Sequence, residues 1–166
     1  MLFRFLLFTV LAGALAACSG PAASDRQPAT AAPATPEVLP ATLPTAEPWT
    51  AADLLPPAEL ARQLTGPGPA PVVFDMGPAG TIKGARPIGP AQEAESLTKL
   101  RAALAGLPKD QPVVVYCGCC PFEPCPNIRP AFQTLKDGGF TKAKLLNLPQ
   151  NLKADWIDKG YPMAAD

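Results

Sequence analysis

The sequence predicts an α/β fold, a single small domain whose parallel sheet is flanked by helices. Two observations lead to this prediction. Short runs of β-branched and aromatic residues alternate with segments of helical spacing from about residue 49 onward. The run 112–116 is almost continuously apolar, which is typical of a central parallel strand buried on both faces.

The first half of this domain is expected to hold two helices and one strand. In residues 57–64, Leu60 and Leu64 lie on one face of a helix. A strand is predicted over residues 71–75, where valines and a phenylalanine follow a proline. Residues 93–104 repeat leucines at intervals of three and four, which predicts the second helix.

The second half begins with the apolar strand at 112–116. A helix is predicted over residues 129–136 and ends at two glycines, a strand follows at 144–148, and a terminal helix is predicted over residues 153–159. In open parallel sheets the functional residues lie beyond the carboxyl ends of the strands. The segment after residue 116 is therefore where we expect the site.

Residues 1–17 have the layout of a secretory signal peptide. Arg4 supplies a positive charge, and the uncharged apolar run that follows is too short and wrongly flanked for a stable spanning helix. The run ends in Leu15-Ala16-Ala17-Cys18, which resembles the lipobox of bacterial lipoproteins. The alternative is an ordinary signal peptide with an incidental cysteine.

The lipobox resemblance implies cleavage before Cys18 and acylation of its thiol, and usually of the new amino group, with palmitate among the expected chains. Several acyl chains give stable anchoring, because each buried methylene adds about 0.8 kcal/mol. Ser19 stands where an aspartate would indicate retention in the inner membrane, so the outer membrane is favoured. We expect a protein of the cell envelope, anchored to the membrane by lipid and facing the periplasm.

Residues 18–48 are expected to form a disordered tether behind the lipidated cysteine. They are rich in Ala, Pro, Thr and Ser, with almost no large apolar residues to offset the entropy lost on ordering. The folded domain is predicted to span residues 49–166.

Composition excludes several classes of function. The chain carries 14 basic and 14 acidic residues and has no basic run, so nothing indicates nucleic-acid binding. It contains no histidine. This excludes Cys-His and Ser-His-Asp catalysis and removes the commonest metal ligand.

The strongest chemical signal is a cysteine cluster after the 112–116 strand. Within nine positions it holds Cys117, Cys119, Cys120 and Cys125. Cys117 comes first, between a strand and a helix, where free N–H groups and the helix dipole lower a thiol pKa. Arg129, near the start of that helix, can add positive charge and is a candidate catalytic residue.

The region from about residue 49 to residue 163 resembles the rhodanese-like domain. The matching pieces, in the family's order, are VVFD at 72–75, GTIKGA at 80–85, VVVYC at 113–117, the helix and turn at 132–140, Trp156 and GYP at 160–162. The resemblance implies a sulfurtransferase fold. In it, Cys117 accepts a sulfane sulfur, holds it as a persulfide among loop amides and passes it to a nucleophile.

The sequence departs from this family at the site. Thr81 replaces the usual histidine, and Met76-Gly77 lacks the arginine that often follows the aspartate. The first arginine after Cys117 is Arg129, twelve positions later. This leaves an insertion of about six residues in the loop, which argues against the phosphatase and arsenate-reductase relatives with their tight anion cradle.

Four functional hypotheses stay open. In the first, Cys117 carries sulfur, no cofactor is expected, and Cys119, Cys120 and Cys125 tune or resolve it. The donor and acceptor are then sulfur or thiol compounds, a class that includes proteins. Its redox variant is a thiol–disulfide relay through the Cys117–Cys120 C-x-x-C pair. In the second, all four thiolates hold Cu(I) or Zn. The third is a loop stapled by disulfides, and the fourth an inactive interaction module.

Asp75, at the end of the first strand, is interpreted as a structural residue. It has no histidine partner for acid or base work.

Overall fold

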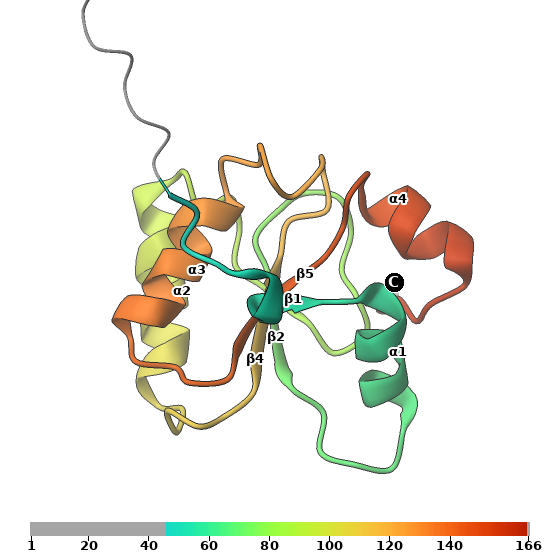
Figure 1. Cartoon of the computed structure of the whole chain (residues 1–166), viewed down its shortest axis with the longest axis horizontal. Coiled ribbons are helices and arrows are strands. Elements are labelled where there is room, and N and C mark those ends of the chain that lie inside the picture. The colour runs from blue at the N-terminus through green and yellow to red at the C-terminus, as the bar shows by residue number, and fades with distance from the viewer. Residues whose placement is uncertain (1–45, 166) are drawn as a thin grey trace, which may run out of the picture. The chain divides into compact units, whose positions relative to one another are not determined.

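The computed structural model describes residues 46–165 (Figure 1). Within them, five strands form one sheet in the order β1-β5-β4-β2-β3, and every neighbouring pair is parallel. The predicted α/β fold, a parallel sheet flanked by helices, is therefore confirmed, and it is consistent with a rhodanese-like fold. The predicted signal peptide, Cys18 and most of the predicted tether lie outside the described residues.

Strands and helices alternate along the chain, except that β3 follows β2 with no helix between them. The strands are β1 (Leu54–Leu55), β2 (Val72–Asp75), β3 (Arg86–Pro87), β4 (Val113–Tyr116) and β5 (Ala143–Leu146). The helices are α1 (Pro57–Thr65), α2 (Ala94–Ala105), α3 (Ile128–Asp137) and α4 (Leu152–Asp155), with 3-10 turns at Ala51–Asp53 and Ile157–Lys159. The predicted strands 71–75, 112–116 and 144–148 correspond to β2, β4 and β5.

Two strands and the end of the chain differ from the prediction. Strands β1 and β3 were not predicted, because each has two residues and so shows no alternation; their pairing with β5 and β2 makes them strands. The predicted helix at 153–159 is divided at Trp156, whose backbone leaves the helical region at φ −131° and ψ −61°. The Trp156 ring is fully buried, and its Nε1–H donates to the carbonyl of Pro162 at 3.2 Å.

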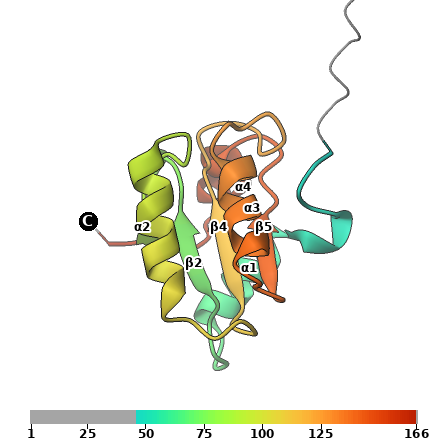
Figure 2. The ribbon, with the colours of Figure 1, turned by 90° about the vertical axis from the view of Figure 1, so that its left-hand side faces the viewer.

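Helices cover both faces of the sheet (Figures 1 and 2). Helices α2 and α3 lie on one face, and α1 and α4 lie on the other. Along β4, Val113 and Val115 join the core under α2 and α3, whereas Val114 and Tyr116 join the opposite core. Burial on both faces explains why this strand is apolar throughout.

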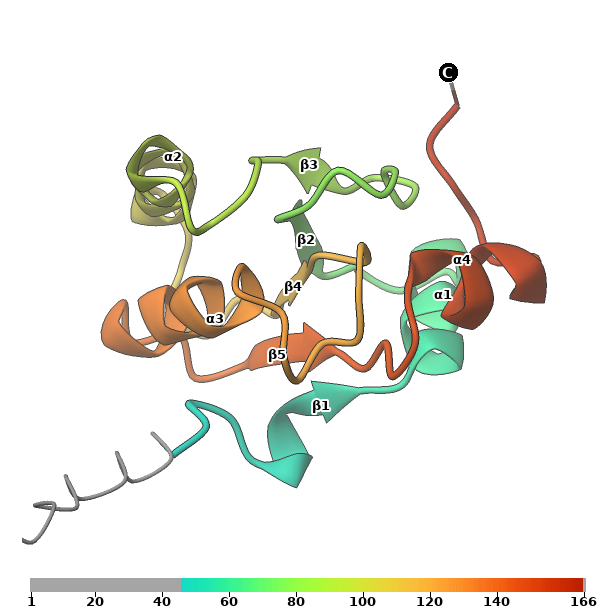
Figure 3. The same ribbon diagram turned by 90° about the horizontal axis from the view of Figure 1, so that it is seen from above.

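Helix α3 places its amino terminus beside the carboxyl edge of the sheet. Ile128, Ala131, Phe132 and Leu135 are buried at helical spacing and hold the helix on the sheet. In β2 and β4, Asp75 pairs with Tyr116, so the two strands end level with each other. The loop of residues 117–127 joins β4 to α3 across this edge, at the top of Figure 1 and in the foreground of Figure 3.

None of the helices in the described part of the chain combines the length and the apolar character needed to cross a membrane.

Candidate functional site

Cys117 is the first residue after β4 and lies where the sequence predicted, at a carboxyl strand end near the start of α3. Only 2% of its surface is exposed. Its position follows from the strand, because β4 is paired on both sides, with β2 and β5, and cannot shift.

The other cysteines of the loop gather around this sulfur. The Cys119 Sγ lies 3.1 Å from the Cys117 Sγ, and the Cys120 Sγ lies 3.6 Å from that of Cys119. The sulfurs of Cys117, Cys119 and Cys125 all lie within 4.8 Å of one another. All four thiols are free; Cys125 is buried like Cys117, whereas Cys119 is exposed. Of Cys119 and the C-x-x-C partner Cys120, it is therefore Cys119 whose sulfur contacts that of Cys117.

The loop is fastened to the segment that follows β5. The amide of Phe122 donates to the carbonyl of Leu148 at 3.1 Å, and the amide of Leu152 donates to the carbonyl of Gly118 at 2.8 Å. The buried Phe122 ring lies 6.0 Å from that of Trp49. These contacts hold the cysteines in place although the loop contains no regular element.

The contacts in the cluster favour a thiolate on Cys117. The adjacent Cys125 thiol, the backbone N–H and thiol of Cys119, and the Asn127 amide lower the pKa of Cys117 to about 5, against the opposing effect of burial. Burial, together with hydrogen bonding to Cys117, raises the pKa of Cys119 to about 12. Donation to Cys117 likewise raises the pKa of Cys125. At neutral pH, therefore, Cys119 and Cys125 are protonated thiols and Cys117 is the thiolate.

Asn127 is a site residue that the sequence analysis missed. Its Nδ2 donates to the Cys117 Sγ at 3.4 Å, and its Oδ1 accepts from the Gln92 amide at 3.2 Å. It is 4% exposed and directly precedes α3. The available signal was an asparagine before a predicted helix, which indicates an N-cap. Its side chain caps nothing and is directed to the thiol instead.

Arg129 has a different set of contacts from those expected of a catalytic group. Its guanidinium pairs with Glu47, at 2.8 Å for Nη2, and lies 5.4 Å from the centre of the Trp49 ring. Glu47 belongs to the segment predicted as a tether, so the last residues of that segment are held against α3. The positive charge of Arg129 is engaged there, and a catalytic role for it stays a prediction.

Gly77, on the loop after β2, lies directly against Cys117. A Cβ at this position would stand 2.2 Å from the carbonyl oxygen of Cys117 and 2.6 Å from its Sγ. No side chain fits in that space. The glycine that departs from the family pattern is thus part of the enclosure around the thiol.

Asp75 holds this loop, in line with the structural role assigned to it. Its Oδ1 accepts from the Gly77 amide at 3.0 Å, and its Oδ2 accepts from the Thr81 hydroxyl at 3.3 Å. Burial raises the pKa of Asp75 to about 6. Thr81, at the position of the family's histidine, is thereby a partner of the carboxyl group.

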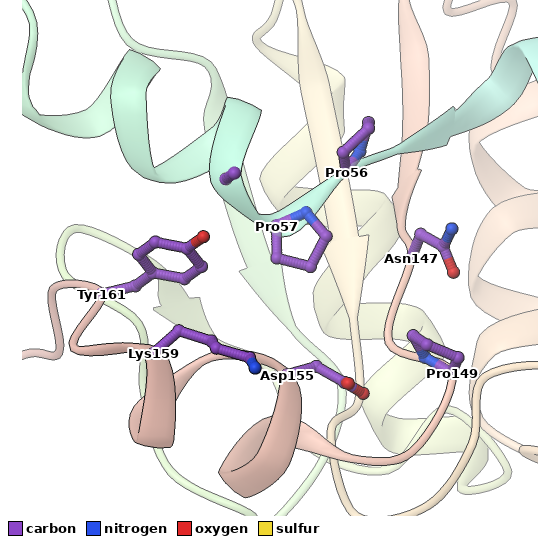
Figure 4. Close-up of a pocket in the computed structure, with 8 residues that line it drawn as sticks. Pro56, Pro57, Asn147, Pro149, Asp155, Lys159 and Tyr161 are labelled. Carbon is purple, nitrogen blue, oxygen red and sulfur yellow. The ribbon is translucent and has the colours of Figure 1, made fainter.

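A separate hollow of about 300 Å³ lies between α1 and α4 (Figure 4). It is lined by Pro56, Pro57, Ala58, Asn147, Pro149, Asp155, Lys159 and Tyr161. These residues include no cysteine, so the hollow is distinct from the thiol site.

Comparison of the chain with protein-family models and with curated proteins gives no match. The rhodanese-like resemblance therefore rests on the ordered motifs in the sequence and on the fold.

The cysteine triad is close enough to bind a metal ion. Thiolates on one zinc ion lie about 2.3 Å from it, so in tetrahedral geometry the sulfurs stand about 3.8 Å apart. The 3.1 Å separation of Cys117 and Cys119 is shorter. The pair would have to open before an ion entered between them.

Proposed function

We propose that this protein transfers sulfane sulfur through Cys117, as a lipid-anchored protein of the cell envelope. The observation that carries the proposal is the Cys117 sulfur at the end of β4, with the thiols of Cys119 and Cys125 and the amide of Asn127 as donors. A thiolate held in this way is a nucleophile at neutral pH.

The reaction follows from that nucleophile. The Cys117 thiolate attacks the outer sulfur of a donor persulfide, R–S–SH, and the S–S bond of the donor breaks. The donor leaves as a thiolate with the electron pair, and Cys117 becomes a persulfide. An acceptor thiolate then attacks the outer sulfur, and Cys117 leaves as a thiolate that the same donors stabilise.

The enlarged loop favours a thiol or protein partner over thiosulfate. In the family, a short loop closes its backbone amides around one anion. The longer loop here, with its cysteines and prolines, offers fewer such amides, so the thiosulfate dianion gains fewer contacts. We expect slow turnover with thiosulfate and faster turnover with a persulfide donor.

Intact-mass measurement after anaerobic purification tests the proposal. Reduced protein sampled early after addition of cysteine persulfide should carry one extra sulfur atom on Cys117, and Cys117→Ala should abolish the gain. Cys125→Ala should alter only the rate or the oxidation sensitivity, because it removes a donor and not the carrier. Absence of a persulfide on Cys117 with every donor, in both the unmodified protein and Cys119→Ser, would refute sulfur transfer.

A second candidate function is soft-metal binding, which the proximity of three sulfurs favours. Sulfur ligands without histidine suit Cu(I) or Zn. Under this hypothesis, Cys117→Ser, Cys119→Ser and Cys125→Ser should each weaken the retention of Cu(I) or Zn, and by a similar factor. Comparable losses, with no persulfide on Cys117, would establish the metal site in place of sulfur transfer.

A further inference from the structure

Cys119 forms no covalent bond in the transfer step described above, in which its thiol only donates to Cys117. Cys119 combines contact with the Cys117 sulfur, at 3.1 Å, with exposure to solvent. Cys125 also lies near Cys117 but is buried, and the Cys120 sulfur lies 3.6 Å from that of Cys119. Contact and access together single out Cys119.

We infer that Cys119 is the resolving residue, which attacks the Sγ of persulfidated Cys117, releases hydrogen sulfide and closes a Cys117–Cys119 disulfide. This rests on the proposed persulfide at Cys117. The protein would then reduce the sulfane sulfur of persulfides at the expense of an external dithiol.

The step balances in atoms and electrons. A bond forms between the Cys119 and Cys117 sulfurs, and the bond from Cys117 to the outer sulfur breaks. The outer sulfur, which carries the negative charge of the persulfide, leaves with the electron pair and takes the Cys119 proton. It departs as HS⁻ and takes a second proton from water to become H₂S. The sulfane sulfur is reduced by two electrons, and the two cysteines are oxidised to a disulfide.

Restoring the thiols requires a reductant, and the exposure of Cys119 determines where it acts. A dithiol attacks the Cys119 sulfur, forms a mixed disulfide and releases Cys117 as the thiolate. The second thiol of the reductant then frees Cys119. Cys117 is the better leaving group of the pair because Cys125 and Asn127 stabilise its thiolate.

The geometry also sets the order of events. In the reduced site the Cys119 thiol is engaged with the Cys117 thiolate. Persulfide formation moves the charge from the Cys117 Sγ to the outer sulfur and removes this acceptor. Cys119 is thereby released next to the atom that it attacks.

The test uses the full-length reduced protein and cysteine persulfide, anaerobically and without reductant. We expect one H₂S released for each disulfide formed, with differential alkylation and fragment mass spectra placing the disulfide between Cys117 and Cys119. Cys119→Ser and Cys119→Ala should lower H₂S release at least ten-fold while the persulfide accumulates on Cys117. Cys120→Ser should still form the Cys117–Cys119 disulfide, and Glu123→Gln, at an exposed loop position, should leave the release unchanged.

The persulfide signal separates the two claims. Two results would overturn the role of Cys119 and leave sulfur transfer through Cys117 intact. One is sulfide release from Cys119→Ser at the rate of the unmodified protein, and the other is a disulfide from Cys117 to Cys125 or Cys120. A lack of persulfide on Cys117 in both the unmodified protein and Cys119→Ser would overturn sulfur transfer and the inference with it.

Discussion

The sulfur of Cys117 depends on single atoms supplied by distant parts of the chain. Asn127 donates a hydrogen bond to it from the start of α3. Gly77, in the loop after β2, packs against Cys117 so closely that no side chain fits between them. Asp75 in turn holds the Gly77 amide. Single substitutions at these positions should therefore affect the thiol in separable ways.

Removing the Asn127 donor should raise the pKa of Cys117. A hydrogen bond to a charged group contributes about 1.5–3 kcal/mol, which corresponds to about one to two pKa units. Alkylation by iodoacetamide rises with pH as the thiolate forms, so its midpoint should move upward from about pH 5 in Asn127→Ala. Mass spectra that follow Cys117 across pH measure this midpoint, and an unchanged midpoint would exclude a contribution from Asn127.

The Gly77 position should accept no larger residue. In Gly77→Ala the methyl group meets the Cys117 carbonyl at 2.2 Å, so backbone must shift. Overpacking of this kind costs about 1–3 kcal/mol of unfolding free energy. Denaturant unfolding should show that loss, together with reduced persulfide formation. Gly68→Ala is the matched control, because its Cβ would meet no atom within 4 Å; equal stability of the two variants would contradict the steric argument.

Asp75 should make the protein less stable as pH rises from about 4 to 6. Its pKa is raised from 3.8 to about 6, so in this range the folded state holds a proton that the unfolded state has lost. The contribution of this group to the free energy of unfolding is largest below about pH 4. It is smaller by about 3 kcal/mol above about pH 6. Denaturant unfolding of Asp75→Asn should lack that part of the pH dependence. Identical slopes in the two proteins would refute it.

At the scale of elements, the cysteine loop is stabilised by its neighbours and not by structure of its own. The Phe122 ring packs on Trp49, whose ring also meets Phe132 of α3 at 6.1 Å. Backbone bonds tie the loop to Leu148 and Leu152. The loop should therefore open locally, before the sheet does, when the aromatic contact is lost.

Phe122→Ala tests this coupling. Deleting the buried ring should lower the free energy of unfolding by up to about 3–5 kcal/mol and should mainly destabilise the loop. We expect faster hydrogen exchange at the amides of residue 122, Cys125 and Leu152, with little change in β4. Ile157→Ala is the control, since Ile157 is an exposed large apolar residue. Uniform acceleration through β4 would mean that the loop and sheet open together.

At the scale of the whole molecule, the fold brings the side chains of the candidate site to one edge of the sheet. Parallel strands end together, so Asp75 pairs with Tyr116 although 41 positions separate them, and Cys117 follows directly. Helix α3 covers the same edge with its amino terminus. An anchor at Cys18 would keep this edge in the envelope, within reach of envelope thiols.

The predicted anchor is tested on the full-length chain. The unmodified protein should partition into detergent, because several acyl chains at Cys18 bind the membrane stably. Cys18→Ser should either be released in soluble form or remain uncleaved. A Cys18→Ser protein that matured and still fractionated with membranes would refute the lipoprotein prediction.

The prediction of the fold succeeded where a pattern was long enough to repeat. Strands β2, β4 and β5 and helices α1, α2 and α3 each span four or more residues, and their apolar spacing distinguishes strand from helix. Strands β1 and β3 carry no such signal, because partners elsewhere in the chain create them. The break at Trp156 depends on burial of its ring.

For the site, local order along the chain was sufficient to place Cys117 between a strand and a helix, and composition was sufficient to exclude histidine chemistry. The sequence by itself therefore determined that Cys117 lies between a strand and a helix and that the chain contains no histidine base. Only the tertiary structure decided that Cys119 touches Cys117, that Asn127 donates to it and that Gly77 encloses it. These are contacts between side chains or loops whose separation depends on the path of the backbone in three dimensions, which residue spacing does not encode.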